Sequence, residues 1–264
     1  MQQSIIAACV CHRGSKRPTN QDNFYFDGQI LPELHTGTDS ILQTRQEIGN
    51  SSFCCAIFDG MGGEQQGERA SFLASQALRQ ALRKPEDFPD GDSLAMLLHS
   101  VNQVICEDRE RQKLRSMGST AALVMLDKGR FYAVNLGDSP IFRVRDGTFQ
   151  QVSIDHTDEN LLKMLGVRRK PALTQHLGLS EEDCLLEPAV FSDDCRTGDL
   201  YLLCSDGLTD MVPKAELSDL LSGEKLPALR KGSDFPCSLT AHLLEMSLER
   251  GGKDNITIQT ITVL

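Results

Sequence analysis

Phe53-Cys54-Cys55-Ala56-Ile57-Phe58-Asp59-Gly60-Met61-Gly62-Gly63 is the stretch that decides the fold, an apolar run that ends in a carboxylate and opens into three glycines within four positions. It predicts a buried strand that stops and turns sharply, because glycine turns tightly without steric cost. A carboxylate beside a backbone carbonyl suits a hard divalent cation. For this stretch taken alone, a tight turn with an exposed Asp59 is the plain alternative.

Three further carboxylates, Asp138, Asp206 and Asp254, stand at the ends of other apolar segments. Together with Asp59 they mark four strand ends that could converge on one acidic cluster. Neither GxxxxGK nor GxGxxG is present, so the sequence does not match the common nucleotide-binding loops.

The residues around these carboxylates form six motifs along the chain. In order, the motifs are Arg17-x-x-Asn20-Gln21-Asp22, Asp59-Gly60-Met61-Gly62-Gly63, Gly118-Ser119-Thr120-Ala121, Gly137-Asp138-Ser139, Ser205-Asp206-Gly207-Leu208-Thr209-Asp210 and Lys253-Asp254-Asn255. Together they resemble the motifs of the metal-dependent protein phosphatases (PPM, protein phosphatase type 2C), in their bacterial form. The resemblance runs from about residue 10 to the C-terminus.

This resemblance implies one catalytic domain over residues 1–264, folded as a four-layer αββα sandwich of two antiparallel sheets flanked by helices. It also implies two Mn²⁺ or Mg²⁺ ions, with a third as an option. Asp59 would bridge the two ions, the Gly60 carbonyl and Asp22 would bind one of them, and Asp206 and Asp254 would bind the other.

The resemblance assigns roles to further residues. Arg17 would grip the substrate phosphate, since a guanidinium can bind two phosphoryl oxygens. Asp138 and Asp210 match positions of a third, weaker metal site, and Asn20 and Asn255 would orient the neighbouring carboxylates. Taken singly, Arg17 is an exposed loop residue, Asp210 is a helix cap, and the asparagines are turn residues.

Four features depart from the family pattern. Met61 stands where many members have a histidine that protonates the leaving group, and a thioether cannot donate a proton. Gln21 replaces an acid, Pro140 replaces an arginine, and the segment 155–178 resembles a shortened form of the flap beside the active site. His156, within that segment, is expected to make a structural hydrogen bond.

The composition restricts the partners and the compartment. Asp and Glu number 37 against 27 Lys and Arg, and the net charge of −10 argues against nucleic acid and anionic membranes. The sequence lacks a long apolar run and a signal-peptide pattern, so we expect a cytoplasmic protein. Nine cysteines without a CxxC pair do not indicate a zinc site.

Periodicity predicts strands at residues 5–12, from 24 onward, and at 53–58, 120–126, 130–136, 141–144, 148–152, 200–204 and 255–263. Helices are expected at 68–83, from a cap at Asp92 or Ser93 to a charged tail at 107–113, and at 214–221 and 238–248. The interval 27–50 is expected to be a loop or an irregular hairpin. Strands in blocks with hairpin links favour α+β over a βαβ arrangement.

We therefore expect a monomeric serine/threonine phosphatase that acts on phosphoproteins opposite a partner kinase, by direct attack of a water bridging two metal ions. We do not expect a cysteine phosphatase. One alternative is a pseudophosphatase that binds phosphoproteins or regulates a kinase, although all five principal metal positions are occupied by suitable residues. Another is a metal-dependent nuclease or other phosphohydrolase, and the acidic net charge argues against polyanionic substrates.

Overall fold

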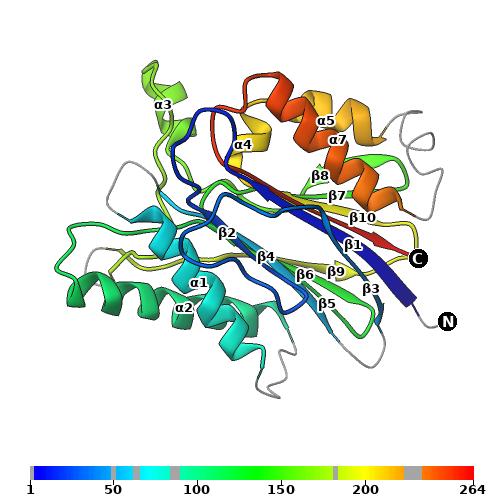
Figure 1. The fold of residues 1–264 in the computed structure, drawn as a ribbon, viewed down its shortest axis with the longest axis horizontal. Helices are drawn as coiled ribbons and strands as arrows, with labels where there is room; N and C mark the ends of the chain where they lie inside the picture. The colour runs from blue at the N-terminus through cyan, green and yellow to red at the C-terminus, as the bar shows by residue number, and fades with distance from the viewer. Residues whose placement is uncertain (1–2, 49–51, 62–65, 84–89, 181–183, 223–233) are drawn as a thin grey trace.

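Two antiparallel sheets stack face to face, and helices cover their outer faces (Figure 1). The computed structural model describes residues 3–48, 52–61, 66–83, 90–180, 184–222 and 234–264. This α+β arrangement confirms the αββα sandwich. The predicted turn after Met61 includes Gly62 and Gly63, which lie outside the described residues.

The first sheet has six strands in the order β3-β1-β11-β10-β7-β8. Their bounds are Leu42–Ile48 for β3, Gln3–His12 for β1, Ile256–Val263 for β11, Leu200–Cys204 for β10, Ile141–Arg145 for β7 and Thr148–Gln151 for β8. Strands β1 and β11 are each paired on both edges, and both are buried along most of their length.

The second sheet has five strands in the order β2-β4-β5-β6-β9. Their bounds are Asp22–Phe26 for β2, Phe53–Asp59 for β4, Ala121–Asp127 for β5, Arg130–Leu136 for β6 and Ala189–Asp194 for β9. The apolar run that ends at Asp59 is thus the second strand of this sheet.

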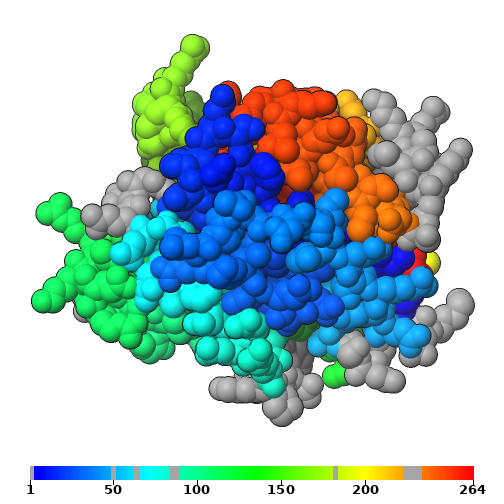
Figure 2. Space-filling model, in the orientation of Figure 1, coloured from blue at the N-terminus to red at the C-terminus, as the bar shows by residue number. Residues whose placement is uncertain are grey.

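Helices form the two outer layers. On the second sheet lie α1 (Gly67–Ala81) and α2 (Gly91–Arg111), and on the first sheet lie α4 (Asp206–Thr209), α5 (Lys214–Ser222) and α7 (Phe235–Glu249). The short helix α3 (Glu159–Leu165) stands away from both layers and projects from the body of the protein (Figure 2). Among the described residues, no helix combines the length and apolar character needed to cross a membrane.

The main core fills the space between the sheets. The rings of Phe131 from β6 and Tyr201 from β10 stack with their centroids 4.2 Å apart. The buried amide of Gln259 on β11 donates to the carbonyls of Tyr25 and Ala56, at 3.2 Å each. A polar group from one sheet therefore satisfies backbone acceptors of the other, which fixes how the sheets face each other.

The sequence did not predict β3, β9, α3 or the single-turn helix α4. The interval 27–50, expected to be a loop or irregular hairpin, contains β3 as a regular edge strand. Both β3 and β9 pair on one edge only and alternate partly buried with exposed side chains, so neither sequence carries an apolar run longer than three residues. The exposed helix α3 buries only Leu162, and so it shows little amphipathic periodicity.

Both predicted ends of α2 were wrong. Asp90 caps the helix, because its side chain accepts a 2.9 Å hydrogen bond from the Ser93 backbone N–H, whereas the sequence indicated Asp92 or Ser93. At the other end the charged stretch stays helical to Arg111, because Asp108 is buried and binds Arg69 of α1 through two hydrogen bonds.

Candidate functional site

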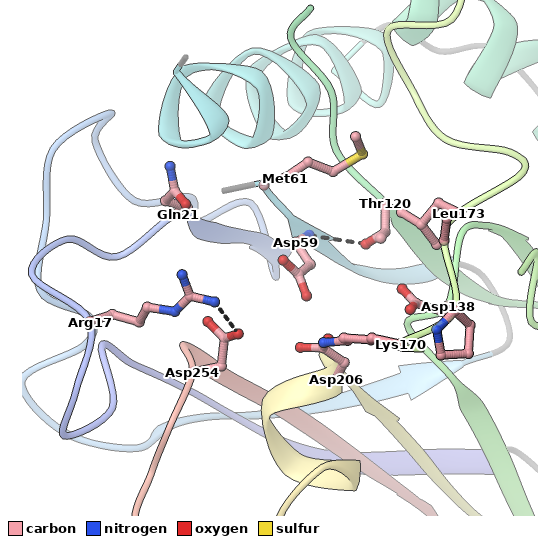
Figure 3. Close-up of a pocket in the computed structure, with 13 residues that line it drawn as sticks. Arg17, Gln21, Asp59, Met61, Thr120, Asp138, Lys170, Leu173, Asp206 and Asp254 are labelled. Atoms are coloured by element: carbon pink, nitrogen blue, oxygen red, sulfur yellow. Dashed lines mark hydrogen bonds and ion pairs between the residues drawn. The ribbon is translucent and has the colours of Figure 1, made fainter. Parts of the chain in front are cut away.

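A pocket with a volume of about 440 Å³ lies at one edge of the sandwich, where strand ends of both sheets meet (Figure 3). Asp59 ends β4 of the second sheet, Asp206 begins α4 directly after β10, and Asp254 precedes β11 of the first sheet. The charged and amide side chains that line it belong to Arg17, Gln21, Asp59, Asp138, Lys170, Asp206 and Asp254. The predicted convergence of four strand-end carboxylates is confirmed.

Asp22 and Asp59 lie directly opposite each other on β2 and β4. Asp22 is almost completely buried, and its Oδ2 accepts hydrogen bonds from the hydroxyls of Thr257 (2.7 Å) and Ser205 (2.8 Å). Its Oδ1 is buried and has no hydrogen-bond partner among the described residues. Two carboxylates paired across a sheet repel each other when ionised, so this arrangement calls for a positive charge beside them.

The raised pKa values of these carboxylates indicate the same requirement for a nearby positive charge. Burial, reinforced by Asp22 and Asp206, raises the pKa of Asp59 well above its usual range. Burial also raises the pKa of Asp22 to about 7 and that of Asp138 to about 6, with the Asp206 charge adding to both shifts. Carboxylates crowded in this way gain most from a bound cation, which favours their ionised form.

The backbone of Asp59 is held by the Ser119-Thr120 motif. Its N–H donates to Thr120 Oγ1 (3.1 Å), and its carbonyl accepts from the Thr120 N–H (2.8 Å) and from Ser119 Oγ (3.0 Å). Thr120 Oγ1 in turn shares a 2.7 Å hydrogen bond with Ser139 Oγ. The sequence predicted only close packing here, whereas these hydroxyls fix the carboxylate-bearing strand end.

Gly60 is packed too tightly for any side chain. A Cβ at this position would lie 2.2 Å from the Gly67 carbonyl oxygen and 2.5 Å from that of Gln21. The Gly60 N–H donates to the same Gln21 carbonyl at 3.1 Å. The requirement for glycine therefore comes from the close approach of α1 and the loop that precedes β2.

Arg17 reaches the pocket from the loop between β1 and β2. Its Nη2 lies 2.6 Å from Asp254 Oδ2, and its side chain is 44% exposed. The hydrogen bond to Asp254, together with the charges of Asp254, Asp206 and Asp59, raises the Arg17 pKa. Arg17 is thus a solvent-accessible cation on the wall of an acidic pocket (Figure 3).

The two asparagines hold backbone near the carboxylates. Asn255 accepts from the Gln21 N–H (2.8 Å) and donates to the carbonyls of Arg13 (2.8 Å) and Thr19 (2.9 Å), which ties down the loop that carries Arg17. Asn20 Oδ1 accepts from the Asp22 N–H at 3.2 Å. Both side chains therefore act on the carboxylates through the backbone that positions them.

Asp138 and Asp210 are placed differently. Asp138 lines the pocket and is partly buried, whereas the Asp210 side chain is 49% exposed at the C-cap of α4.

His156 accepts a 3.1 Å hydrogen bond at Nδ1 from the Gly137 N–H, which confirms its predicted structural role.

Two polar residues of the pocket were not assigned a contact from the sequence. Lys170 Nζ lies 3.2 Å from Asp206 Oδ2 and 3.5 Å from Asp210 Oδ2. Gln21 Nε2 donates to Glu68 Oε2 at 2.8 Å, so it balances a carboxylate in the first turn of α1. No motif marks Lys170, and the only signal in the sequence is the basic run Arg168-Arg169-Lys170.

The donor set fits a hard divalent cation. The carboxylates of Asp22, Asp59, Asp206 and Asp254 and the Gly60 carbonyl are oxygen donors of the kind that Mg²⁺ and Mn²⁺ prefer. Among the described residues, no three Asp, Glu, His or Cys side chains form a closed ligand cluster by themselves. Backbone carbonyls and water would therefore complete the coordination, as is usual for Mg²⁺. The buried Asp22 Oδ1, which has no hydrogen-bond partner among the described residues, is a further oxygen that could bind such a cation.

Comparison with known proteins gives a consistent result. Residues 38–243 match the model of the family described as Protein phosphatase 2C. The chain is 30% identical to the serine/threonine protein phosphatase PstP of Mycobacterium tuberculosis over 270 residues, which cover 96% of this chain and 44% of PstP. It is 28% identical to the serine/threonine phosphatase stp of Listeria welshimeri over 216 residues, covering 76% of this chain and 81% of the relative.

A solved structure extends the likeness to the whole fold. The catalytic domain of PstP in complex with two manganese ions matches with a TM-score of 0.74 and 26% identity, covering 99% of both chains. The present chain spans less than half the length of full PstP.

Proposed function

The chain belongs to the protein phosphatase 2C family, and from this we propose that it is a serine/threonine protein phosphatase that hydrolyses phosphoserine and phosphothreonine in phosphoproteins. One observation carries the proposal. Asp59, paired across the strands with the buried Asp22, meets Asp206 and Asp254 from the edge of the other sheet beside an accessible arginine. The named relatives are serine/threonine phosphatases, which supports this substrate class.

We assign two Mn²⁺ or Mg²⁺ ions to the pocket. Asp59 would bind both, Asp22 and the Gly60 carbonyl would bind one, and Asp206 and Asp254 would bind the other. The two manganese ions in the PstP catalytic domain support this number. When bound, such ions would activate water for direct attack on phosphorus and would neutralise charge on the phosphoryl oxygens. Asp138 and Asp210 are assigned to a third, weaker site.

The protein side chains bind and orient the substrate. Arg17 would exchange part of its contact with Asp254 for two phosphoryl oxygens, which its planar guanidinium can bind at once. Asn255 fixes the loop that presents Arg17, and the Thr120 hydroxyl fixes the Asp59 backbone. Met61 lines the pocket but has no proton to give, so the leaving serine or threonine oxygen takes its proton from water.

We further propose one catalytic domain over residues 1–264 that acts as a cytoplasmic monomer on the products of a partner serine/threonine kinase. The net charge of −10 supports a protein substrate over nucleic acid or an anionic membrane. A pseudophosphatase would be expected to lack metal ligands, whereas all five principal positions carry suitable residues.

The test is hydrolysis of p-nitrophenyl phosphate and a phosphothreonine peptide, with and without Mn²⁺. We expect Mn²⁺-dependent turnover that collapses in Asp206→Asn, because a metal ligand is removed. Arg17→Ala should mainly raise KM, whereas Arg130→Ala, a variant of an exposed arginine in another ion pair, should behave as wild type. Mn²⁺ binding without turnover on any substrate would overturn the proposal and favour the pseudophosphatase.

A further inference from the structure

Lys170 brings a positive charge into the pocket from outside both sheets. Its Nζ lies 3.2 Å from Asp206 Oδ2 and 3.5 Å from Asp210 Oδ2, so it bridges the two carboxylates. Figure 3 shows Lys170 entering from the side opposite Arg17, with its amine beside Asp206. The two cations therefore hold different carboxylates, Asp254 on one wall and Asp206 on the other.

The backbone around Lys170 is anchored. At the base of the loop that carries α3, the Asp158 N–H donates to the Ala172 carbonyl (3.0 Å), and the Ala172 N–H donates to Asp158 Oδ1 (2.8 Å). Arg169, next to Lys170, forms an ion pair with the same Asp158. The Thr174 N–H donates to the His156 carbonyl at 2.9 Å. This ladder holds residue 170 at the mouth of the pocket.

A lysine at this position affects the binding of a metal cation more than it affects the free energy of folding. The Lys170 side chain is 67% exposed, and an exposed ion pair contributes little to the free energy of folding. A divalent ion that approaches Asp206 and Asp210 must nevertheless displace the ammonium or bind beside it, and like charges at such distances repel. The ammonium and a third metal ion held by Asp138 and Asp210 thus compete for the Asp210 carboxylate.

We propose that Lys170 acts as a built-in cation that pairs with Asp206 and competes with a third divalent ion for Asp210, so that the resting protein takes up two ions rather than three. The inference rests on the proposed metal binding in this pocket. Lys170 is thus a positioning residue, because its ammonium holds the carboxylates of Asp206 and Asp210. Through these contacts Lys170 also links the loop that carries α3 to α4, the helix that contains Asp206.

The test is the number and affinity of bound Mn²⁺ ions, measured by isothermal titration calorimetry and equilibrium dialysis at pH 7.5. The key variant is Lys170→Gln, which keeps most of the side-chain length and removes the charge. Lys163→Gln is the matched control, because Lys163 belongs to the same loop, is similarly exposed (65%), and pairs with Glu159 of α3, which does not line the pocket.

We expect two Mn²⁺ ions in the wild type and in Lys163→Gln. Lys170→Gln should bind a third ion, or bind its weakest ion roughly threefold to tenfold more tightly. Asp210→Asn added to Lys170→Gln should remove that gain.

Two results would overturn the inference in different ways. If the wild type binds two ions and Lys170→Gln binds them with the same number and affinities, competition by Lys170 is wrong and the proposed function stands. If neither protein binds Mn²⁺, both the competition and the proposed metal-dependent phosphatase are wrong.

Discussion

Thr257 Oγ1 donates a 2.7 Å hydrogen bond to Asp22 Oδ2, and so joins strand β11 of one sheet to strand β2 of the other, close to the pocket. Ser205, which follows β10, adds a second hydroxyl at 2.8 Å. Hydrogen bonds to a carboxylate favour its ionised form. The two donors therefore oppose the effect of burial, which drives the Asp22 pKa upward.

Thr257→Val should weaken Mn²⁺ binding roughly tenfold near pH 7, because one charge-assisted hydrogen bond is lost. The Asp22 pKa rises further in this variant, so the ion has to displace a proton. Calorimetric titrations at pH 6.5, 7.5 and 8.5 would show the deficit shrinking as the pH rises. Thr262→Val is the control on the same strand, since the buried Thr262 hydroxyl has no partner among the described residues. An equal loss in both variants would contradict the role of Thr257.

Without metal ions, we expect ionisation of Asp22 to make the folded protein less stable as the pH rises from 5 to 8. The folded-state pKa of Asp22, about 7, lies above the ordinary 3.8. Between these values the folded state holds a proton that the unfolded state has released, so stability falls as the pH rises through that interval. Added Mn²⁺ should reverse the trend, because it binds the ionised carboxylates.

The measurement is the difference in Tm between wild type and Asp22→Asn in a chelating buffer at pH 5 and pH 8. This difference removes the opposing effect of histidines such as His12 and His176, whose pKa values are lowered by burial. The wild type should lose stability relative to Asp22→Asn on going from pH 5 to pH 8. A constant difference would show that Asp22 titrates normally.

Asn255→Ala should raise KM for a phosphopeptide more than it lowers kcat. The substitution releases the carbonyls of Arg13 and Thr19 and the N–H of Gln21, so the loop that presents Arg17 is no longer fixed. We also expect a loss of about 1–3 kcal/mol in the free energy of unfolding, because polar backbone groups lose their partner.

Asn23→Ala is the control for Asn255→Ala, because it releases a different loop. Asn23 is fully buried and bonds the backbone of Leu31 through both ends of its amide, in the loop that follows β2. It should reduce Tm by a comparable amount and leave KM unchanged. A similar rise of KM in both variants would mean that general destabilisation, rather than the position of Arg17, sets substrate affinity.

Asp108→Asn should lower the free energy of unfolding by about 3 kcal/mol, since it breaks the ion pair of the buried Asp108 with Arg69 and leaves Arg69 only its pair with Glu33. Thermal unfolding should show Tm falling by roughly 5–10 °C. Asp194→Asn, which removes the exposed partner of Arg130, should hardly change Tm. Equal effects would show that burial of Asp108 does not strengthen its pairing.

The predictable parts of the fold are those whose burial follows a local pattern. Strands β4, β5, β6, β10 and β11 are apolar or alternating runs, and their bounds were predicted to within a residue or two. Strand β3 and helix α3 were missed because both leave much of their surface in solvent.

The site divides in the same way. Asp59, Asp206 and Asp254 stand in recognisable motifs, whereas the contacts of Thr257 with Asp22 and of Lys170 with Asp206 form only when distant segments meet, 235 and 36 residues apart along the chain. Nothing in the residues beside Thr257 or Lys170 specifies these partners. The carboxylates could therefore be predicted, and the groups that control their charge could not.

The pairing of β1 with β11 has a consequence for the nascent polypeptide. Cys9 and Gln259 are register partners although 250 residues separate them. On the ribosome, β1 emerges early and waits with one hydrogen-bonding edge open until β11 is made, and pairings of such long range form slowly. Asp254 arrives with that same late strand. An unfinished chain consequently has neither a complete first sheet nor a complete pocket, so the proposed activity requires that nearly all of the described sequence has been translated.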